Sequence, residues 1–192
     1  MSSASDAQQW YPVMLRLTGK RVLVVGGGKV ATRKVDGLTA AGALVTVVAP
    51  VITDELRTRA DITIEQRPYA SGDVAGYWLA VVSTDDAGTQ QQVFDDGERL
   101  GVWVNAADDP DRCSFILPAV VRRGPVVVSV STAGASPALA QELRDRIADG
   151  LPPELEAVAA DLAARRRDIQ AGGGSTEEVD WRPLVKRLLD DE

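Results

Sequence analysis

Short hydrophobic runs alternate with amphipathic segments through the first half of the chain. Val22–Val25, Leu44–Pro50 and Trp78–Thr84 are nearly all apolar, as in strands buried on both faces, whereas Ile62–Gln66 alternates. Val102–Asn105 is a fifth short strand candidate. The helices expected between them are Lys29–Ala41, Thr53–Ala60 with Thr53 as its cap, and a segment that begins at Thr84 or Asp85 and ends at Leu100. This alternation predicts an α/β fold with a Rossmann-like, doubly wound parallel sheet.

The pattern changes in the second half. Ser114–Val121 and Val126–Thr132 predict two strands joined by a turn at Arg122–Pro125, as a central β-hairpin. Helices are expected over Pro137–Ala148, with Ser136 as its cap, over Glu154–Gln170, and around Trp181–Leu189 after a flexible joint at Gly172–Ser175. We therefore expect a nucleotide-binding domain over 1–113, a dimerisation segment over 114–149 and a C-terminal helical domain over 150–192. A homodimer would cover the apolar edge of the hairpin.

Three glycines directly follow the first predicted strand. Gly26, Gly28 and Ala31 fit G-x-G-x-x-A, the alanine form of the dinucleotide fingerprint. Strand, glycine turn and helix in this order would point the N–H groups of the first helical turn at one spot, which suits a phosphate. The alternative is a glycine turn that closes a βα unit and binds nothing. The βα units downstream favour a dinucleotide site.

Composition narrows the classes of function. The 192 residues are 45% hydrophobic and 26% charged, with no stretch as long as a membrane span, so we expect a cytoplasmic protein without a membrane partner. The net charge of −7 argues against nucleic-acid binding. There is no histidine and a single cysteine, Cys113, which we expect in the core. A Cys/His zinc site is therefore excluded, no metal ligands are assigned, and acid–base chemistry falls to other side chains.

Three segments together resemble the precorrin-2 dehydrogenase family, the N-terminal module of sirohaem synthases. They are VVGGGKVATRK (24–34), NAADDPDRCSFILPA (105–119) and VSVSTAGASPALA (128–140), with YWLAVVSTDD (77–86) as a fourth shared block. The resemblance implies an NAD-dependent oxidation of precorrin-2, a tetrapyrrole, to sirohydrochlorin by a homodimer. Some members of the family also insert iron, so sirohydrochlorin ferrochelatase activity stays open. One alternative is an NAD-sensing regulatory domain without tetrapyrrole turnover, and another is a small-substrate dehydrogenase.

The resemblance assigns the catalytic role to Asp108, in the N-x-x-D block that begins at Asn105. A carboxylate beside the nicotinamide can accept the proton that leaves when the neighbouring ring carbon loses a hydride. Asp108 follows the fifth predicted strand, at the sheet edge where open α/β folds bind ligands. The spacing alone favours a solvated acidic loop around Pro110, and the resemblance favours Asp108 as the catalytic residue.

The cofactor positions that match the family are Gly26, Gly28, Lys29 and Val30 in the first turn, and Pro50 and Val51 after the second strand. That strand ends without the acid that holds the ribose of NAD, and without an adjacent arginine for NADP. The resemblance, and not the residue pattern, therefore favours NAD. Thr84 and Asp85 are expected along the nicotinamide half, or alternatively as a helix N-cap with an acid in the first turn.

Precorrin-2 carries eight carboxylates, so its pocket should contain cations and hydroxyls. The candidate substrate-binding residues are Asn105, Arg112, Thr132 and Ser136. Arg122 and Arg123 could also pair with carboxylates, although a solvated turn explains them equally well. For Ser136, a helix cap is the structural alternative.

Overall fold

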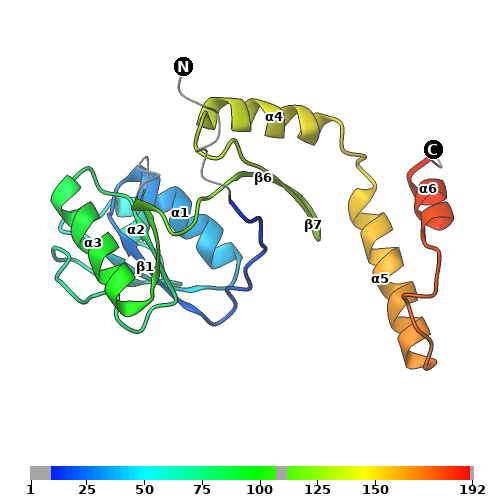
Figure 1. The fold of residues 1–192 in the computed structure, drawn as a ribbon, viewed down its shortest axis with the longest axis horizontal. Helices are drawn as coiled ribbons and strands as arrows, with labels where there is room; N and C mark the ends of the chain where they lie inside the picture. Colours follow the sequence, from blue (N-terminus) through cyan, green and yellow to red (C-terminus); the bar gives the residue numbers. More distant parts are fainter. Residues whose placement is uncertain (1–9, 107–111, 191–192) are drawn as a thin grey trace, which may run out of the picture. The chain divides into compact units, whose positions relative to one another are not determined.

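The computed structural model describes residues 10–106 and 112–190 (Figure 1). The chain forms two compact units that divide between Leu117 and Pro118. Within the second unit, the separation of a dimerisation segment from a C-terminal helical domain stays a prediction.

The first unit is built on a five-stranded parallel sheet with the order β3-β2-β1-β4-β5. The strands are β1 (Arg21–Val25), β2 (Leu44–Val48), β3 (Thr63–Glu65), β4 (Leu79–Val82) and β5 (Trp103–Ala106). All five were predicted from the hydrophobic runs, and the doubly wound α/β fold is confirmed. The order reverses between β1 and β4, which is where open α/β sheets bind ligands.

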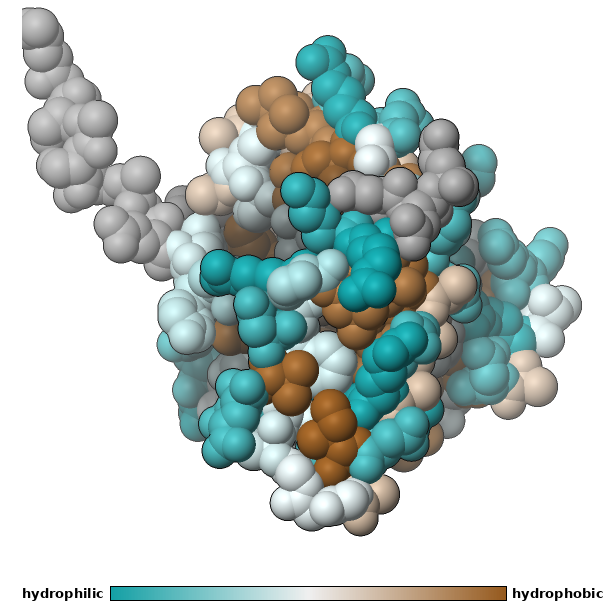
Figure 2. All heavy atoms as spheres, turned by 90° about the vertical axis from the view of Figure 1, so that its right-hand side faces the viewer, coloured by the Kyte–Doolittle hydropathy of each residue, from teal (hydrophilic) through white to brown (hydrophobic). Residues whose placement is uncertain are grey.

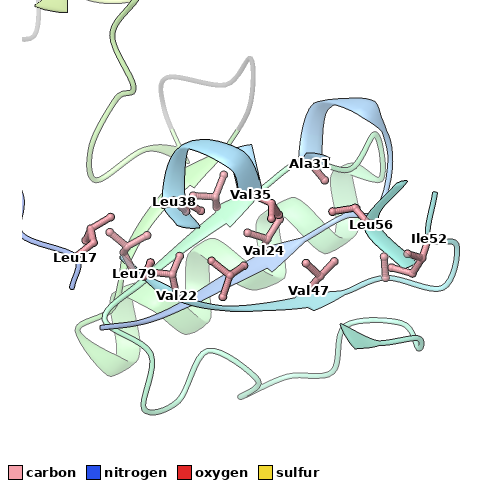
Figure 3. Close-up of a cluster of buried hydrophobic side chains, with 14 residues drawn as sticks. Leu17, Val22, Val24, Ala31, Val35, Leu38, Val47, Ile52, Leu56 and Leu79 are labelled. Atoms are coloured by element: carbon pink, nitrogen blue, oxygen red, sulfur yellow. The ribbon is translucent and has the colours of Figure 1, made fainter. Parts of the chain in front are cut away.

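Helices on the two faces of the sheet enclose two hydrophobic cores. Side chains alternate along a strand, so Val22 and Val24 of β1 pack with α1 (Lys29–Ala40) and α2 (Asp54–Arg57), as Figure 3 shows. Leu23 and Val25 lie in the second core, with Val93 from α3 (Ala87–Leu100). Cys113 is buried in this second core, as expected.

Several expected boundaries shift in the first unit. β2 ends at Val48 and not at Pro50, because Pro50 has no N–H to extend the ladder. α2 ends at Arg57, well before Ala60. Thr53 is at the N-cap position of α2, but its side chain does not cap the helix; its hydroxyl lies 3.4 Å from that of Thr32.

The segment from Ser114 to Pro118 is not the start of a strand, which corrects the prediction of one over Ser114–Val121. Cys113 forms an antiparallel bridge with Asn105, and the Ser114 N–H donates to the Val104 carbonyl at 2.7 Å. Phe115 then packs against the first core and Ile116 against the second. The segment thereby covers the outer edge of β5, which would otherwise be open to pairing with another strand.

The second unit consists of an antiparallel hairpin and three helices, as expected. β6 (Ala119–Arg123) pairs with β7 (Val126–Val130), so Arg122 and Arg123 are exposed strand residues and not part of the turn. The turn is Gly124-Pro125, and Gly124 has the positive φ of 53° that favours glycine. The helices are α4 (Pro137–Asp149), α5 (Leu155–Ala171) and α6 (Arg182–Asp190).

The hydrophobic core of the second unit is small. α4 packs against both strands, α5 against β7 and α6 against α5. Among the described residues of this unit, the buried apolar side chains are Val121, Ala140 and Val158. Other apolar side chains reach the surface, and hydrophobic groups lie between hydrophilic ones on the face shown in Figure 2. None of the described helices is long and apolar enough to cross a membrane.

Candidate functional site

The glycine turn after β1 is shaped by close backbone packing. Gly26 has φ +129°, and a Cβ at this position would lie 2.2 Å from the carbonyl oxygen of Ser83. A Cβ at Gly27 would lie 2.1 Å from the carbonyl oxygen of Val51. A Cβ at Gly28 would meet nothing within 4 Å. The first two glycines are therefore required by the fold, whereas the third borders open space.

The start of α1 opens onto that space. Gly28 is the N-cap residue in an extended conformation, and no described side chain caps the helix. The first turn of α1 contains no acidic residue either. The N–H groups of a first helical turn lack partners within the helix, and the helix dipole is positive there. This end of α1 thus has the chemistry of an anion site.

The predicted cofactor residues surround this turn. The Thr53 N–H donates to the Gly27 carbonyl at 2.9 Å, which holds the loop after β2 against the glycines. Val51 in that loop is 76% exposed, and Pro50 and Lys29 are exposed as well. Val30 is 40% exposed. These side chains leave an apolar and cationic surface beside the anion site.

At the end of β4, the expectation that Thr84 or Asp85 caps α3 is wrong. The N-cap is Asp86, whose carboxylate accepts from the N–H groups of Gly88 and Thr89. These backbone hydrogen bonds lower the pKa of Asp86. Thr84 accepts instead from the Asp86 N–H through its hydroxyl and from Gln90 through its carbonyl. Asp85 is exposed at the carboxyl edge of the sheet.

Asn105 lies near the end of β5 and links it to the segment after Cys113. Its side chain is buried, and its amide donates to the Phe115 carbonyl at 2.9 Å. The Cys113 thiol donates to the Ala106 carbonyl at 3.2 Å. These hydrogen bonds hold the end of β5 next to the segment that begins at Cys113. Asp108, the expected catalytic residue, belongs to the connection between β5 and Cys113 and lies outside the described residues.

Arg112 is attached to α3. Its Nε donates to Oε1 of Gln91 at 2.8 Å, and the residue is half-buried.

Thr132 and Ser136 belong to the second unit, where they build the start of α4. The Thr132 hydroxyl accepts from the Ser136 N–H and donates to the Ser136 carbonyl, both at 3.0 Å. Ser136 caps α4 through the Leu139 N–H at 3.1 Å, which confirms its expected role as a cap. Between them, Ala133 has a positive φ of 53°, which is uncommon for a residue with a side chain.

Two residues near the site were not found from the sequence. Arg57, five residues beyond Ile52, donates to the Ile52 carbonyl and to Gln66, and lies 3.9 Å from Asp54. Arg57 is the last residue of α2, and its side chain reaches back to the loop after β2. Ser83 contacts the glycine turn through its backbone. The sequence motif predicted its neighbours Thr84 and Asp85 as site residues and did not include Ser83. Among the described residues, no group of three or more His, Cys, Asp or Glu side chains could hold a metal ion.

A parallel sheet with a tight glycine turn and an uncapped helix start at its carboxyl edge defines a dinucleotide-binding unit. Comparison with known families agrees with this class. Residues 13–119 match the family described as "Putative NAD(P)-binding", and residues 123–149 match "Sirohaem biosynthesis protein central". The chain belongs to this NAD(P)-binding family, in the group of precorrin-2 dehydrogenases and sirohaem synthases.

Individual relatives support the same assignment. The chain is 43% identical to the siroheme synthase of Nitrosococcus oceani over 162 residues, which is 83% of this chain and 34% of that protein. It is 42% identical to the siroheme synthase of Methylococcus capsulatus over 164 residues, 82% of this chain and 35% of that protein. The chain thus spans about a third of the length of these relatives. The solved structure of SirC, precorrin-2 dehydrogenase, matches with a TM-score of 0.77 and 29% identity, over 95% of this chain and 90% of that chain.

Proposed function

We propose that this protein is an NAD-dependent dehydrogenase that oxidises precorrin-2 to sirohydrochlorin in sirohaem biosynthesis. The observation that carries the proposal is the glycine turn with its uncapped α1 start, in a chain that matches SirC over 95% of its length. In the reaction, precorrin-2 loses a hydride and a proton, and NAD⁺ becomes NADH. The bound nicotinamide supplies the hydride acceptor.

The residues at the carboxyl edge fit a dinucleotide. The α1 N–H groups above Gly28 would bind the pyrophosphate, since a Cβ at Gly28 would meet nothing within 4 Å and the space beside it is open. Pro50, Val51 and Val30 would contact the adenosine half. Thr84 and Asp85 would lie along the nicotinamide half.

Arg57 supports NAD over NADP as the cofactor. An arginine beside this strand end can hold the 2′-phosphate of NADP. Here the guanidinium already donates to Ile52 and Gln66 and lies near the Asp54 carboxylate. A 2′-phosphate would therefore have to compete with an acid and two existing hydrogen bonds. Calorimetric titration with both dinucleotides tests this, and tighter binding of NADP would contradict it.

We assign proton transfer and part of substrate binding to the first unit. Asp108 would accept the proton from precorrin-2, and Asn105 would be a substrate-binding residue. In the first unit, Arg112 would bind a carboxylate of the macrocycle through its N–H groups, and in the second unit Ser136 would do so through its O–H group. The O–H of Thr132 already donates to the Ser136 carbonyl, so Thr132 would act by holding Ser136 in place.

We also propose that the protein is a homodimer in the cytoplasm. Leu139, Leu143 and Ile147 are 50%, 39% and 37% exposed and lie one turn apart on α4. Together with the small core of the second unit, this stripe is typical of a surface that a second copy covers. The chain has a single cysteine, Cys113, and so no disulfide within the chain, which suits the reducing cytoplasm.

A pair of aspartate variants tests the mechanism. Asp108→Ala should abolish precorrin-2 oxidation and leave NAD binding unchanged, because the carboxylate accepts the proton and does not hold the cofactor. Asp109→Ala is the matched control and should retain turnover. Full turnover by Asp108→Ala, measured under anaerobic conditions by NADH formation, would refute the assignment.

A further inference from the structure

One hydroxyl group in the first unit is buried without a hydrogen-bond partner. Among the described residues, Ser83 Oγ is the buried side-chain oxygen or nitrogen that lacks one. Other buried polar groups of this unit are paired: Asp96 accepts from four donors, and Asn105 donates to Phe115. An unpaired buried hydroxyl destabilises the protein unless something else supplies the missing partner.

Ser83 is placed where the strand order of the sheet reverses. It directly follows β4, and its N–H donates to the carbonyl of Val25, the last residue of the neighbouring β1, at 2.7 Å. Its carbonyl group packs against Gly26, where any side chain would clash. The serine therefore borders the glycine turn at the crossover between β1 and β4, where ligands of open α/β sheets bind.

The rest of the residue lies near the surface. Ser83 as a whole is half-buried, although its Oγ is fully covered. Rotation about the Cα–Cβ bond carries the hydroxyl between staggered positions. A ligand at the crossover can thus offer the hydroxyl a partner that the protein itself does not provide. The four residues before it, Leu79–Val82, are apolar and buried. An apolar side chain at position 83 would therefore satisfy the packing as well as serine does.

We propose that the Ser83 hydroxyl binds the dinucleotide cofactor directly, through a hydrogen bond to a polar group of its pyrophosphate or nicotinamide-ribose portion. The inference rests on the proposed function, since it requires that the chain binds NAD. Ser83 would act as a cofactor-binding residue alongside the α1 N–H groups. Cofactor binding would then satisfy a hydroxyl that is unpaired in the free protein.

The substitution Ser83→Ala separates this role from a structural one. Removing an unpaired hydroxyl should leave the melting temperature of the cofactor-free protein unchanged or slightly higher. The same substitution should weaken NAD binding about five- to tenfold, as expected for one lost hydrogen bond. Thermal unfolding without NAD and calorimetric titration with NAD measure the two effects on the full chain.

Ser71→Ala is the matched control. The Ser71 hydroxyl donates to Asp96 at 3.1 Å, so its removal should lower the melting temperature and leave NAD affinity unchanged. If Ser83→Ala binds NAD as tightly as the wild type, or only lowers the melting temperature, the inference is overturned. If the wild type itself does not bind NAD, the proposed function fails, and the inference fails with it.

Discussion

At the scale of single residues, Gly26 and Gly28 belong to one fingerprint but are constrained differently. Gly26 has a positive φ, and the Ser83 carbonyl occupies the space of its missing side chain. Gly28 has φ −88°, which any residue adopts, and open space around it. The fold therefore explains Gly26, whereas the proposed pyrophosphate site would explain the absence of a side chain at Gly28.

This difference predicts opposite results for two alanine variants. Gly26→Ala should destabilise the first unit strongly, because the new Cβ would overlap backbone that cannot move aside. Gly28→Ala should keep the melting temperature within a few degrees of the wild type and weaken NAD binding at least tenfold, because its methyl group enters the phosphate site. Thermal unfolding and NAD titration measure both. Unchanged NAD affinity in Gly28→Ala would contradict the placement of the pyrophosphate.

At the scale of elements, hydrophobic runs predicted every strand of the parallel sheet. The largest error was the prediction of a strand over Ser114–Pro118. This apolar segment instead covers the edge of β5: Cys113 forms one bridge with Asn105, and Phe115 and Ile116 pack against the two cores. Local pattern does not distinguish such a segment from a strand, because both bury apolar side chains. The N-cap of α3 was also misplaced, since three capping candidates, Thr84, Asp85 and Asp86, stand in a row.

The site was predictable only where its residues form a local motif. Gly26 and Gly28 were found because their roles depend on the turn they make themselves. Ser83 was missed because its contacts are made with the neighbouring strand β1, which is distant in sequence, and such contacts have no signature along the chain. Arg57 was missed because it does not directly follow β2 but reaches back to Ile52 from α2.

Asp96 joins α3 to the loop between β3 and β4. It is 4% exposed and accepts from Tyr69, Ser71, Gly72 and Arg99. Burial alone would raise the pKa of Asp96, but these hydrogen bonds outweigh it and lower the pKa to about 2. The charged carboxylate therefore stabilises the contact between the two elements.

Asp96→Asn should lower the free energy of unfolding at neutral pH by about 2 kcal/mol. This is the free energy that corresponds to the lowering of the Asp96 pKa in the folded state. The pKa in the folded state lies below the ordinary value of 3.8, so this stabilisation is complete above that pH and is lost as the pH falls toward 2. The difference between wild type and variant should shrink over that range. The exposed neighbour Asp95→Asn is the control and should have little effect in urea unfolding. An Asp96→Asn variant as stable as the wild type would contradict this account.

At the scale of the whole molecule, the two units differ in how they are stabilised. The first encloses two cores around its sheet, whereas the described part of the second buries few apolar side chains. The exposed stripe of Leu139, Leu143 and Ile147 on α4 is the surface that a second copy would cover.

Leu143→Glu should convert a dimer to a monomer, because it places a charge in the middle of that stripe. Gln141→Glu adds a charge to an exposed position of the same helix and should leave the dimer intact. Sedimentation velocity at micromolar concentration distinguishes the two states. If the wild type is a monomer, the proposal of a homodimer is wrong.

We propose that the whole protein oxidises a tetrapyrrole with a nicotinamide dinucleotide. The most direct test of this proposal is anaerobic incubation of the full chain with precorrin-2 and NAD, followed by visible and ultraviolet absorption. Sirohydrochlorin and NADH should appear together in equal amounts. Tight NAD binding without any turnover would contradict it and would favour a nucleotide-sensing domain.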